Sequence, residues 1–285
     1  MPHRTRIPAL AAALLLGLAT TTASAAAPAT AAPGHAARRS PHTIYSGVFK
    51  EARHGEVLTT VATCPPGQFA TGGGSWNYDY DQPNTFTVSS YGGDDFWVTQ
   101  ANQIFPSSTT TSVISEVVCS PAPHTALMEP EGAGVEIPAN GVATHIARCP
   151  AGQVPSGGGP RTSNGLILTS SSIPFNDGWA ITAKNVDASP GHLWVNVTCA
   201  TVPHPVTIGQ TQQIPSGGHV SAKADCPQDR VLTGGGVQTS DGSVYVRDVY
   251  PSEDAQRVAR FWEARAVNTS ATPQTVTAWA ICTTP

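Results

Sequence analysis

Short apolar segments alternate with turn residues along most of the chain. In the first third these segments are residues 57–63, 69–73, 86–90, 97–101 and 112–119, and the residues between them are rich in glycine, proline, asparagine and aspartate. Short segments rich in valine, threonine and aromatic residues are typical of β-strands. Charged residues make up only 12% of the chain, whereas long surface helices are usually rich in glutamate, lysine and arginine. The pattern therefore predicts an all-β protein.

One motif occurs three times, at residues 64–74, 149–159 and 226–236. Each copy begins with Cys-Pro, and a glycine triplet starts eight residues after the cysteine. Farther along, each copy has an aromatic residue, an alanine and an asparagine. The asparagines Asn102, Asn185 and Asn268 are 83 residues apart both times. Each copy then ends in an apolar segment that carries a second cysteine. This spacing indicates an internal repeat of roughly 80 residues.

The repeat predicts how the six cysteines pair, although six cysteines allow 15 pairings in principle. Each copy should join its own two ends, which gives Cys64 with Cys119, Cys149 with Cys199, and Cys226 with Cys282. Closing loops of this length stabilises a domain by roughly 4 kcal/mol. The alternative is that the cysteines are free or bind a metal, but no C-x-x-C spacing is present. We therefore predict no metal site and no cofactor.

The glycine triplets have two interpretations. A phosphate-binding loop needs Lys-Ser or Lys-Thr after its glycines, or G-x-G-x-x-G at the start of a helix; here Ser75, Pro160 and Val237 follow the triplets. Alternatively, glycines permit a bulge, or the close approach of a backbone or an aromatic ring, in a crowded sheet. Asn164-Gly165 and Asp241-Gly242 lie after two of the triplets and predict hairpins with both central residues at positive φ. We favour the structural interpretation.

Three tryptophans recur at equivalent or adjacent positions of the copies, which indicates a shared place in the core. Packing against the disulfides is the expected location of Trp97, Trp179 and Trp262.

The first copy has a longer connection after its triplet. Trp76, Tyr78 and Tyr80 alternate there with Asn77, Asp79 and Asp81. In an extended segment the three rings lie on one face and the polar side chains on the other. Rings can cover the apolar face of a sugar while amides and carboxylates bind its hydroxyl groups, so these six residues are a candidate saccharide site. In the alternative interpretation, Trp76 fills the local core and the tyrosines cover a loop.

The N-terminus has the pattern of a secretory signal peptide. Arg4 and Arg6 precede an apolar run at residues 7–18, and small residues that end in Ala23-Ser24-Ala25 follow. This predicts a signal peptide at residues 1–25, because the run is shorter than the about 20 residues that span a membrane. Residues 26–48 begin with a run rich in alanine, proline and threonine, which is typical of a flexible leader. We expect a secreted, extracellular protein without a membrane span.

The charge of the chain argues against two classes of partner. The first 40 residues hold four of the 15 basic residues and none of the 19 acidic ones, so the remainder has a net charge of −8. Nucleic acids and anionic lipids bind clustered lysine and arginine, and the chain has no such run. We predict no nucleic-acid partner.

The sequence lacks the motifs of common hydrolases. It has no G-x-S-x-G turn and no H-E-x-x-H helix. We expect no histidine to recur in register through all three copies, and we expect His124 and His204 to lie in linkers. Glu253-Asp254 is most simply a solvated turn, and Asp79-Tyr80-Asp81 lacks the glycine and the distal glutamate of a calcium loop. We therefore predict no catalytic residue.

The pattern C-P-x-G…G-G-G…W…N…C resembles repeat modules of exported actinobacterial proteins, most of which have no assigned activity. The resemblance spans all three copies, but the third copy lacks the glycine after Cys-Pro, and no catalytic residues transfer with it. We predict homologous, disulfide-linked β modules of about 75 residues at 49–122, 136–202 and 208–285. Short linkers favour modules packed side by side, and a pseudo-threefold axis is one way to arrange them.

Three functions remain open. The first is a secreted, non-enzymatic binding or surface-associated protein that contacts an extracellular polysaccharide or cell-wall polymer through residues 76–81. The second is an extracellular hydrolase, or an inhibitor of one, with its site between modules. A structural role at the cell surface is a third.

Overall fold

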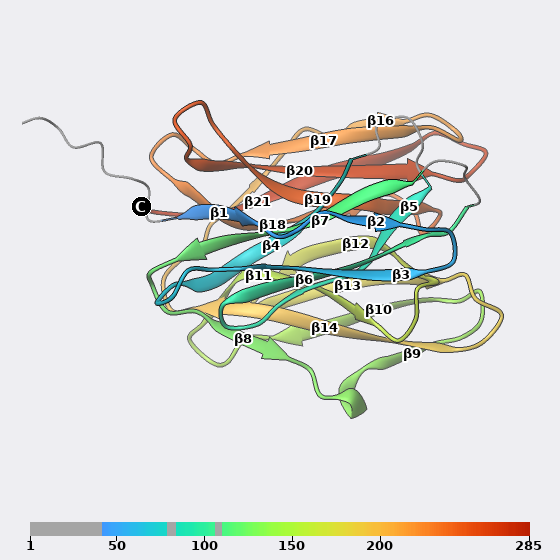
Figure 1. Ribbon diagram of the computed structural model, residues 1–285, viewed down its shortest axis with the longest axis horizontal. Coiled ribbons are helices and arrows are strands. Elements are labelled where there is room, and N and C mark those ends of the chain that lie inside the picture. The colour runs from blue at the N-terminus through green and yellow to red at the C-terminus, as the bar shows by residue number, and fades with distance from the viewer. Residues whose placement is uncertain (1–41, 79–83, 106–109) are drawn as a thin grey trace, which may run out of the picture. The chain divides into compact units, whose positions relative to one another are not determined.

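The computed structural model describes residues 42–78, 84–105 and 110–285 (Figure 1). Nearly all regular structure in these residues is β-strand, and their one helical turn is the 3-10 helix η1 (Glu131–Ala133). No helix in this part of the chain is long and apolar enough to cross a membrane. The all-β prediction is confirmed.

The strands fall into three sets of seven along the chain, which we call sets 1, 2 and 3. Set 1 contains β1 (Thr43–Ser46), β2 (Lys50–Ala52), β3 (Val57–Thr63), β4 (Phe69–Asn77), β5 (Thr85–Gly92), β6 (Phe96–Gln103) and β7 (Thr111–Ser120). Set 2 contains β8 (Thr125–Met128), β9 (Val135–Ile137), β10 (Val142–Arg148), β11 (Val154–Thr162), β12 (Ile167–Phe175), β13 (Gly178–Asn185) and β14 (Gly191–Ala200). Set 3 contains β15 (Val206–Ile208), β16 (Gln212–Ile214), β17 (His219–Asp225), β18 (Val231–Thr239), β19 (Val244–Glu253), β20 (Ala259–Asn268) and β21 (Gln274–Thr283).

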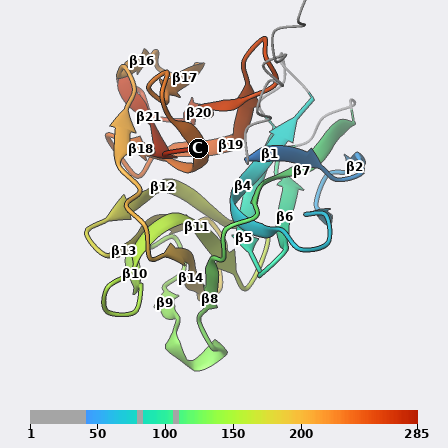
Figure 2. The same cartoon turned by 90° about the vertical axis from the view of Figure 1, so that its left-hand side faces the viewer.

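Strands pair in the same way within each set. In set 1, β7 pairs with β1, β2 and β4, and β6 pairs with β3 and β5. The matching pairs in set 2 are β14 with β8, β9 and β11, and β13 with β10 and β12. In set 3 they are β21 with β15, β16 and β18, and β20 with β17 and β19. Each set therefore forms two half-sheets, and the three sets occupy three sectors in Figure 2.

Each disulfide connects the two half-sheets of one set. The bonds are Cys64–Cys119, Cys149–Cys199 and Cys226–Cys282, the pairs that the repeat predicts. In every set the first cysteine follows the last residue of an outer strand, and the second lies near the end of the set's last strand. Trp97, Trp179 and Trp262 are fully buried in the same clusters as these cysteines. The predicted core position of the tryptophans is confirmed.

The glycine triplets lie in the strands where the three sets approach one another. A Cβ at Gly73 would lie 2.6 Å from the Trp97 ring, so the second glycine makes room for the tryptophan of its own set. A Cβ at Gly72 would lie 2.6 Å from the Cα of Gly234, so the first glycine makes room for another set. Real Cβ atoms do not come this close to other atoms, and any side chain would force the backbones apart. The triplets are structural, as the second interpretation predicts.

The residue before each triplet is a β-bulge whose side chain reaches another set. Pairing shifts by one residue at Thr71, Ser156 and Thr233, and all three side chains are fully buried. Thr71 Oγ1 donates to Thr233 O at 2.6 Å, Thr233 Oγ1 to Ser156 O at 3.3 Å, and Ser156 Oγ to Thr71 O at 3.0 Å. We call this closed ring of contacts the hydroxyl cycle. It links the sets in an approximately threefold manner.

The sets also join through their sheets. β4 of set 1 pairs with β19 of set 3 at Ser75 and Val249, and β18 of set 3 pairs with β12 of set 2 at Val237 and Ser172. Pro160 of β11 stands at the position of Ser75 and Val237, one residue after the triplet. Proline has no N–H to donate, which accounts for the absence of a β11–β5 pair among the described strands.

The structure corrects the predicted hairpins. β11 does not pair with β12, and β18 does not pair with β19, because each of these connections crosses from one sheet to another. None of the residues Asn164, Gly165, Asp241 and Gly242 has positive φ. The Asn164 and Asp241 side chains accept hydrogen bonds from the N–H groups two residues on, at 2.9 and 2.7 Å. Such side-chain turns are the local alternative to a type I′ turn.

Three expectations about chain segments are also corrected. The predicted leader at 26–48 includes β1, and the stretch between the first two predicted modules includes β8. His124 and His204 lie in the connections between sets, as expected, and both are buried there. A histidine does recur, because His42, His124 and His204 each lie just before the first strand of a set. Variable spacing to the next cysteine hides this recurrence in the sequence.

We expect Thr71→Val to destabilise the fold by about 1–3 kcal/mol, because it keeps the side-chain shape but leaves the buried Thr233 carbonyl without its partner from set 1. The measurement is urea unfolding with the disulfides intact. Thr63→Val is the control, since Thr63 is an exposed strand residue and surface changes usually stay within about 0.5 kcal/mol. Equal midpoints for the two variants would contradict the role assigned to the hydroxyl cycle.

Candidate functional site

An open cleft of about 650 Å³ lies where set 1 meets set 3. Residues far apart in the sequence form its two sides, because β4 of set 1 continues into β19 of set 3 within one sheet. Set 1 contributes Ile44, Ser46, Trp76 and Glu116, and set 3 contributes Tyr250, Pro251, Ser252, Glu253, Asp254, Arg257 and Glu263.

Aromatic rings gather at one side of the cleft. Trp76 lies 5.1 Å from Tyr78, 6.2 Å from Tyr250 and 6.4 Å from Phe49, measured between ring centroids. We call these four residues the aromatic cluster. Phe49 and Tyr78 are 48% and 60% exposed, whereas Trp76 and Tyr250 are partly buried and line the cleft. The contacts of Trp76 with Tyr78 and Phe49 are edge-to-face and that with Tyr250 is tilted, and such contacts favour fixed ring orientations.

Carboxylates line the cleft beside these rings. Burial raises the pKa of Glu116 to about 7; the Ser46 hydroxyl, 3.3 Å from Glu116 Oε1, opposes the shift, and the nearby carboxylates of Glu253, Asp248 and Glu263 add to it. Glu116 Oε2 is buried and has no hydrogen-bond partner among the described residues. Glu116 therefore exchanges a proton near neutral pH.

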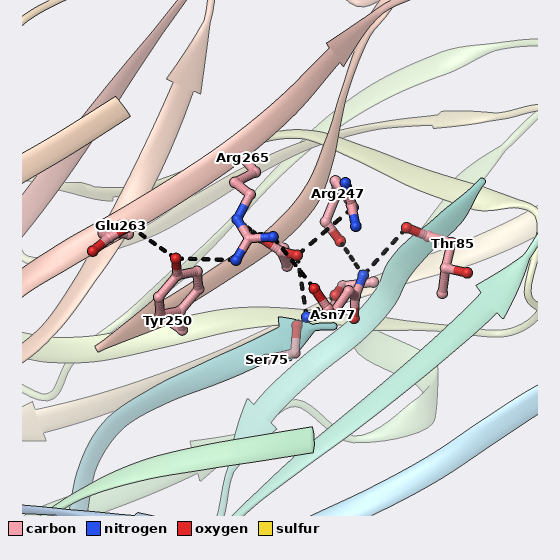
Figure 3. A network of polar contacts seen from close by, with 9 residues as sticks. Ser75, Asn77, Thr85, Arg247, Tyr250, Glu263 and Arg265 are labelled. Carbon is pink, nitrogen blue, oxygen red and sulfur yellow. Dashed lines mark hydrogen bonds and ion pairs between the residues drawn. The ribbon is translucent and has the colours of Figure 1, made fainter. Parts of the chain in front are cut away.

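A buried polar network supports the set 3 side of the cleft (Figure 3). Tyr250 donates its hydroxyl proton to Glu263 Oε2 at 2.8 Å and accepts a hydrogen bond from Arg265 Nη2 at 3.1 Å. Arg265 Nε lies 3.3 Å from Asp248 Oδ1, and Arg247 Nε lies 3.8 Å from Asp248 Oδ2. This chain of contacts fixes the orientation of Glu263 in the cleft.

Asp248 is fully buried at the centre of this network. Burial raises its pKa to about 6, and the guanidinium groups of Arg265 and Arg247 oppose the shift. Asp248 is therefore ionised at neutral pH and balances part of the buried positive charge. Its Oδ2 also accepts a hydrogen bond from the Asn77 N–H at 3.2 Å, which ties set 3 to set 1.

The same inter-set contact occurs at the other two interfaces with a neutral side chain. Ser89 Oγ accepts from the Thr162 N–H at 3.0 Å, and Ser171 Oγ accepts from the Thr239 N–H at 3.1 Å. Both serines follow a bulge, as Asp248 does. A single serine is therefore enough to join two sets, and the buried charges distinguish the interface that carries the cleft.

A second cleft, of about 420 Å³, lies between sets 2 and 3, but its chemistry differs. Gln238 stands there at the position of Trp76, two residues after the glycine triplet. Asp241 is the one carboxylate on its described walls. A third, enclosed cavity of about 20 Å³ lies between the glycine strands, and it has room for about one water molecule. The cleft between sets 1 and 3 thus has the richest combination of rings and charges.

The predicted site residues divide into three groups. Trp76 and Tyr78 lie together in the aromatic cluster, as their alternation predicts. Asn77 does not face solvent: it is fully buried, and its Nδ2 donates to Thr85 O and to Arg247 O, both at 3.2 Å. We therefore remove Asn77 from the candidate site. Asp79, Tyr80 and Asp81 lie outside the described residues.

Sequence reasoning missed most of the set 3 side of the cleft. Glu253 and Asp254, which the sequence places in a solvated turn, both line the cleft, and Asp254 also contacts Arg260 Nε at 2.9 Å. The sequence does contain one indication of this wall. Three charged residues, Arg247, Asp248 and Arg265, lie within apolar strand segments of a chain that has few charges. Charged residues in such strands are buried only when they are paired.

Metal chemistry has no visible basis at these sites. Among residues 42–78, 84–105 and 110–285, no group of three or more histidine, cysteine, aspartate or glutamate side chains is arranged to hold a metal ion. Comparison with known proteins adds no chemistry, since no protein-family model and no curated protein matches the chain.

We expect Asp248→Ser to destabilise the protein by about 3–5 kcal/mol, because it removes the buried carboxylate that faces the guanidinium groups of Arg247 and Arg265. The triple variant Arg247→Val/Asp248→Ser/Arg265→Gln should recover most of this loss. It copies the residues at the matching positions of set 1, which are Val88, Ser89 and Gln100. Chemical unfolding of both variants provides the measurement. A triple variant as unstable as the single one would contradict the equivalence of the interfaces.

Proposed function

We propose that this chain is an exported, non-enzymatic protein that binds an extracellular saccharide, such as a cell-wall polymer, in the cleft between sets 1 and 3. The signal-peptide pattern at residues 1–25 supports export. The three disulfides fit this proposal, because such bonds persist in oxidising compartments outside the cytosol. We further propose that the three sets are homologous modules related to those of exported actinobacterial proteins; their shared pairing pattern supports this.

The observation that carries the proposal is the combination of fixed aromatic rings and carboxylates in one open cleft. Trp76 and Tyr250 can cover the C–H face of a sugar ring, and Glu116, Glu253 and Glu263 can accept hydrogen bonds from its hydroxyl groups. The polar network holds Glu263 in place before a ligand arrives, which reduces the entropy lost on binding.

The charge of the cleft favours a saccharide that carries protonated amino groups. Four carboxylates line the cleft, and Arg257 is the one basic side chain on its described walls. Arg257 is mostly exposed and lies 3.9 Å from Glu253, so it compensates this charge weakly. A cation near an aromatic face gains further energy from the ring quadrupole. A uronic-acid polymer would meet repulsion at the same place.

We expect Trp76→Ala to weaken binding of de-N-acetylated chitotetraose at least about tenfold, because stacking rings near the centre of a site contribute a large share of affinity. The measurement is isothermal titration calorimetry at pH 7 and low salt. N-acetylated chitotetraose should bind more weakly, and tetragalacturonate should not bind.

The matched control for this experiment is Gln238→Ala, which changes the equivalent position in the second cleft and should leave affinity unchanged. Failure of all three tetrasaccharides to bind, or equal losses in the two variants, would count against a saccharide site in this cleft.

One observation favours a second candidate, an extracellular glycoside hydrolase whose site lies between sets. A carboxyl group with its pKa raised by burial, beside a second carboxylate, is the arrangement of a general acid and its partner. Glu116 has such a pKa, and Glu263 is held in the same cleft by Tyr250.

If the hydrolase candidate is correct, Glu116→Gln lowers the release of reducing ends from chitosan and other polysaccharides by at least about 100-fold, because the amide cannot donate the proton. A reducing-sugar assay of the wild-type protein and the variant, purified in parallel, measures this. Equal release by both preparations, or none by either, would rule out this candidate and leave binding as the function.

A further inference from the structure

Three buried histidines lie together where the chain enters each set. His42 precedes β1, His124 precedes β8, and His204 lies two residues before β15. Each follows a proline in the sequence. Their exposed fractions are only 5%, 7% and 8%, although histidine is usually less completely buried. We call these residues the histidine cluster.

The backbone hydrogen-bonds one ring nitrogen of two of these histidines. His124 Nδ1 lies 2.8 Å from Ala122 O, and His204 Nδ1 lies 2.7 Å from Val202 O. A carbonyl oxygen only accepts, so Nδ1 carries a proton in both rings. Both Nε2 atoms are buried without a hydrogen-bond partner among the described residues. The two ring centroids are 5.6 Å apart.

The surroundings of the cluster keep all three rings neutral. Burial lowers the pKa of His42 and of His124 to about 4, and it lowers the pKa of His204 as well. His124 and His204 both lower the pKa of His42 further by repulsion, and His204 does the same to His124. The hydrogen bonds to the Ala122 and Val202 carbonyls oppose the shifts at His124 and His204 without reversing them. Burial and repulsion therefore make protonation of the cluster harder than that of an exposed histidine.

His42 connects the cluster to the candidate cleft through β1. This strand lies at the edge of its sheet and pairs through four residues with β7 alone. Ile44 of β1 packs against the core of set 3, and Ser46 Oγ contacts Glu116 Oε1. Both residues line the cleft. A change that detaches β1 therefore removes part of one wall of the cleft.

We propose that the histidine cluster is an acid-sensitive latch that holds β1 at the sheet edge while the rings are neutral and releases it when they take up protons. Release exposes His42 to water. The latch itself is independent of any ligand. Its consequence for binding, a lower affinity when β1 is released, rests on the proposed saccharide site.

Linkage gives the size of the expected effect. With a pKa of about 4 when β1 is bound and about 6.5 when it is released, His42 alone raises the equilibrium constant for release by about 25-fold between pH 7.5 and pH 5. The sign follows from the lowered pKa: the released state binds more protons, so acid favours it.

Hydrogen exchange measured by mass spectrometry tests the latch. After correction for intrinsic exchange rates, protection of a peptide covering β1 should fall at least about 25-fold between pH 7.5 and pH 5. A peptide covering β21 should keep its protection, because it reports unfolding of the core. His42→Gln keeps a neutral polar side chain and should remove most of the pH dependence. The control is His219→Gln, which changes an exposed histidine of β17. This variant should keep the full pH dependence of protection at β1.

Three results would overturn the latch. These are constant protection of β1 across this pH range, an unchanged pH dependence in His42→Gln, and parallel loss of protection in β21. Should His42→Gln fail to fold, an NMR titration of the wild-type imidazoles decides: three rings that stay neutral at pH 5.5 support the latch, and normal titration near pH 6.5 overturns it.

The consequence for binding is tested separately with de-N-acetylated chitotetraose at pH 7 and pH 5. We expect wild-type affinity to fall more steeply with acid than the affinity of His42→Gln. Glu116 titrates in both proteins, whereas only the wild-type protein has the complete histidine cluster. Equal slopes would overturn the coupling. Absence of any binding would reject the saccharide site and leave the exchange result intact.

Discussion

The hydroxyl cycle is the contact on which the rest of the structure depends. Its three side chains are buried, and each satisfies a carbonyl of another set, so removing one leaves a polar group without its partner. The adjacent glycines are needed because the backbones almost touch there. Together these demands explain why Thr-Gly-Gly-Gly or Ser-Gly-Gly-Gly occurs three times. They also explain why the described strands belong to one compact unit rather than three.

A threefold backbone supplies three similar interfaces, and one of them has acquired different chemistry. Two interfaces are joined by serine and lack buried charge at this contact, whereas the third places Asp248 between two arginines. Burying ions costs more than burying a serine and rarely improves stability. The same interface carries the aromatic cluster and the acidic cleft. A gain in stability does not explain why this interface contains buried charges. The charges do orient Tyr250 and Glu263 toward the cleft, which gives a reason for their presence.

The sequence predicts the parts of this fold that depend on repeated local chemistry. Paired cysteines, glycine triplets and recurring tryptophans each have one use in a crowded sheet, and the structure confirms those uses. Asn164-Gly165 and Asp241-Gly242 misled because the same dipeptides also form side-chain turns at sheet corners. The set 3 wall of the cleft was not predictable, because Glu253 and Glu263 meet Glu116 only after two sets pair, more than 130 residues apart in the chain.

Two groups that respond to protons affect the set 1 wall of the cleft: Glu116 lines this wall, and His42 of the histidine cluster directly precedes β1, which forms part of it. As the pH falls, Glu116 gains a proton first, near pH 7, and the cleft loses part of the negative charge that would attract a cation. The histidine cluster resists protonation until more acidic conditions, because burial and mutual repulsion lower its pKa values. For the proposed cationic saccharide, both changes would act against binding, the first through charge and the second through the position of β1. Under these two proposals the cleft would hold its ligand at neutral pH and release it in acid.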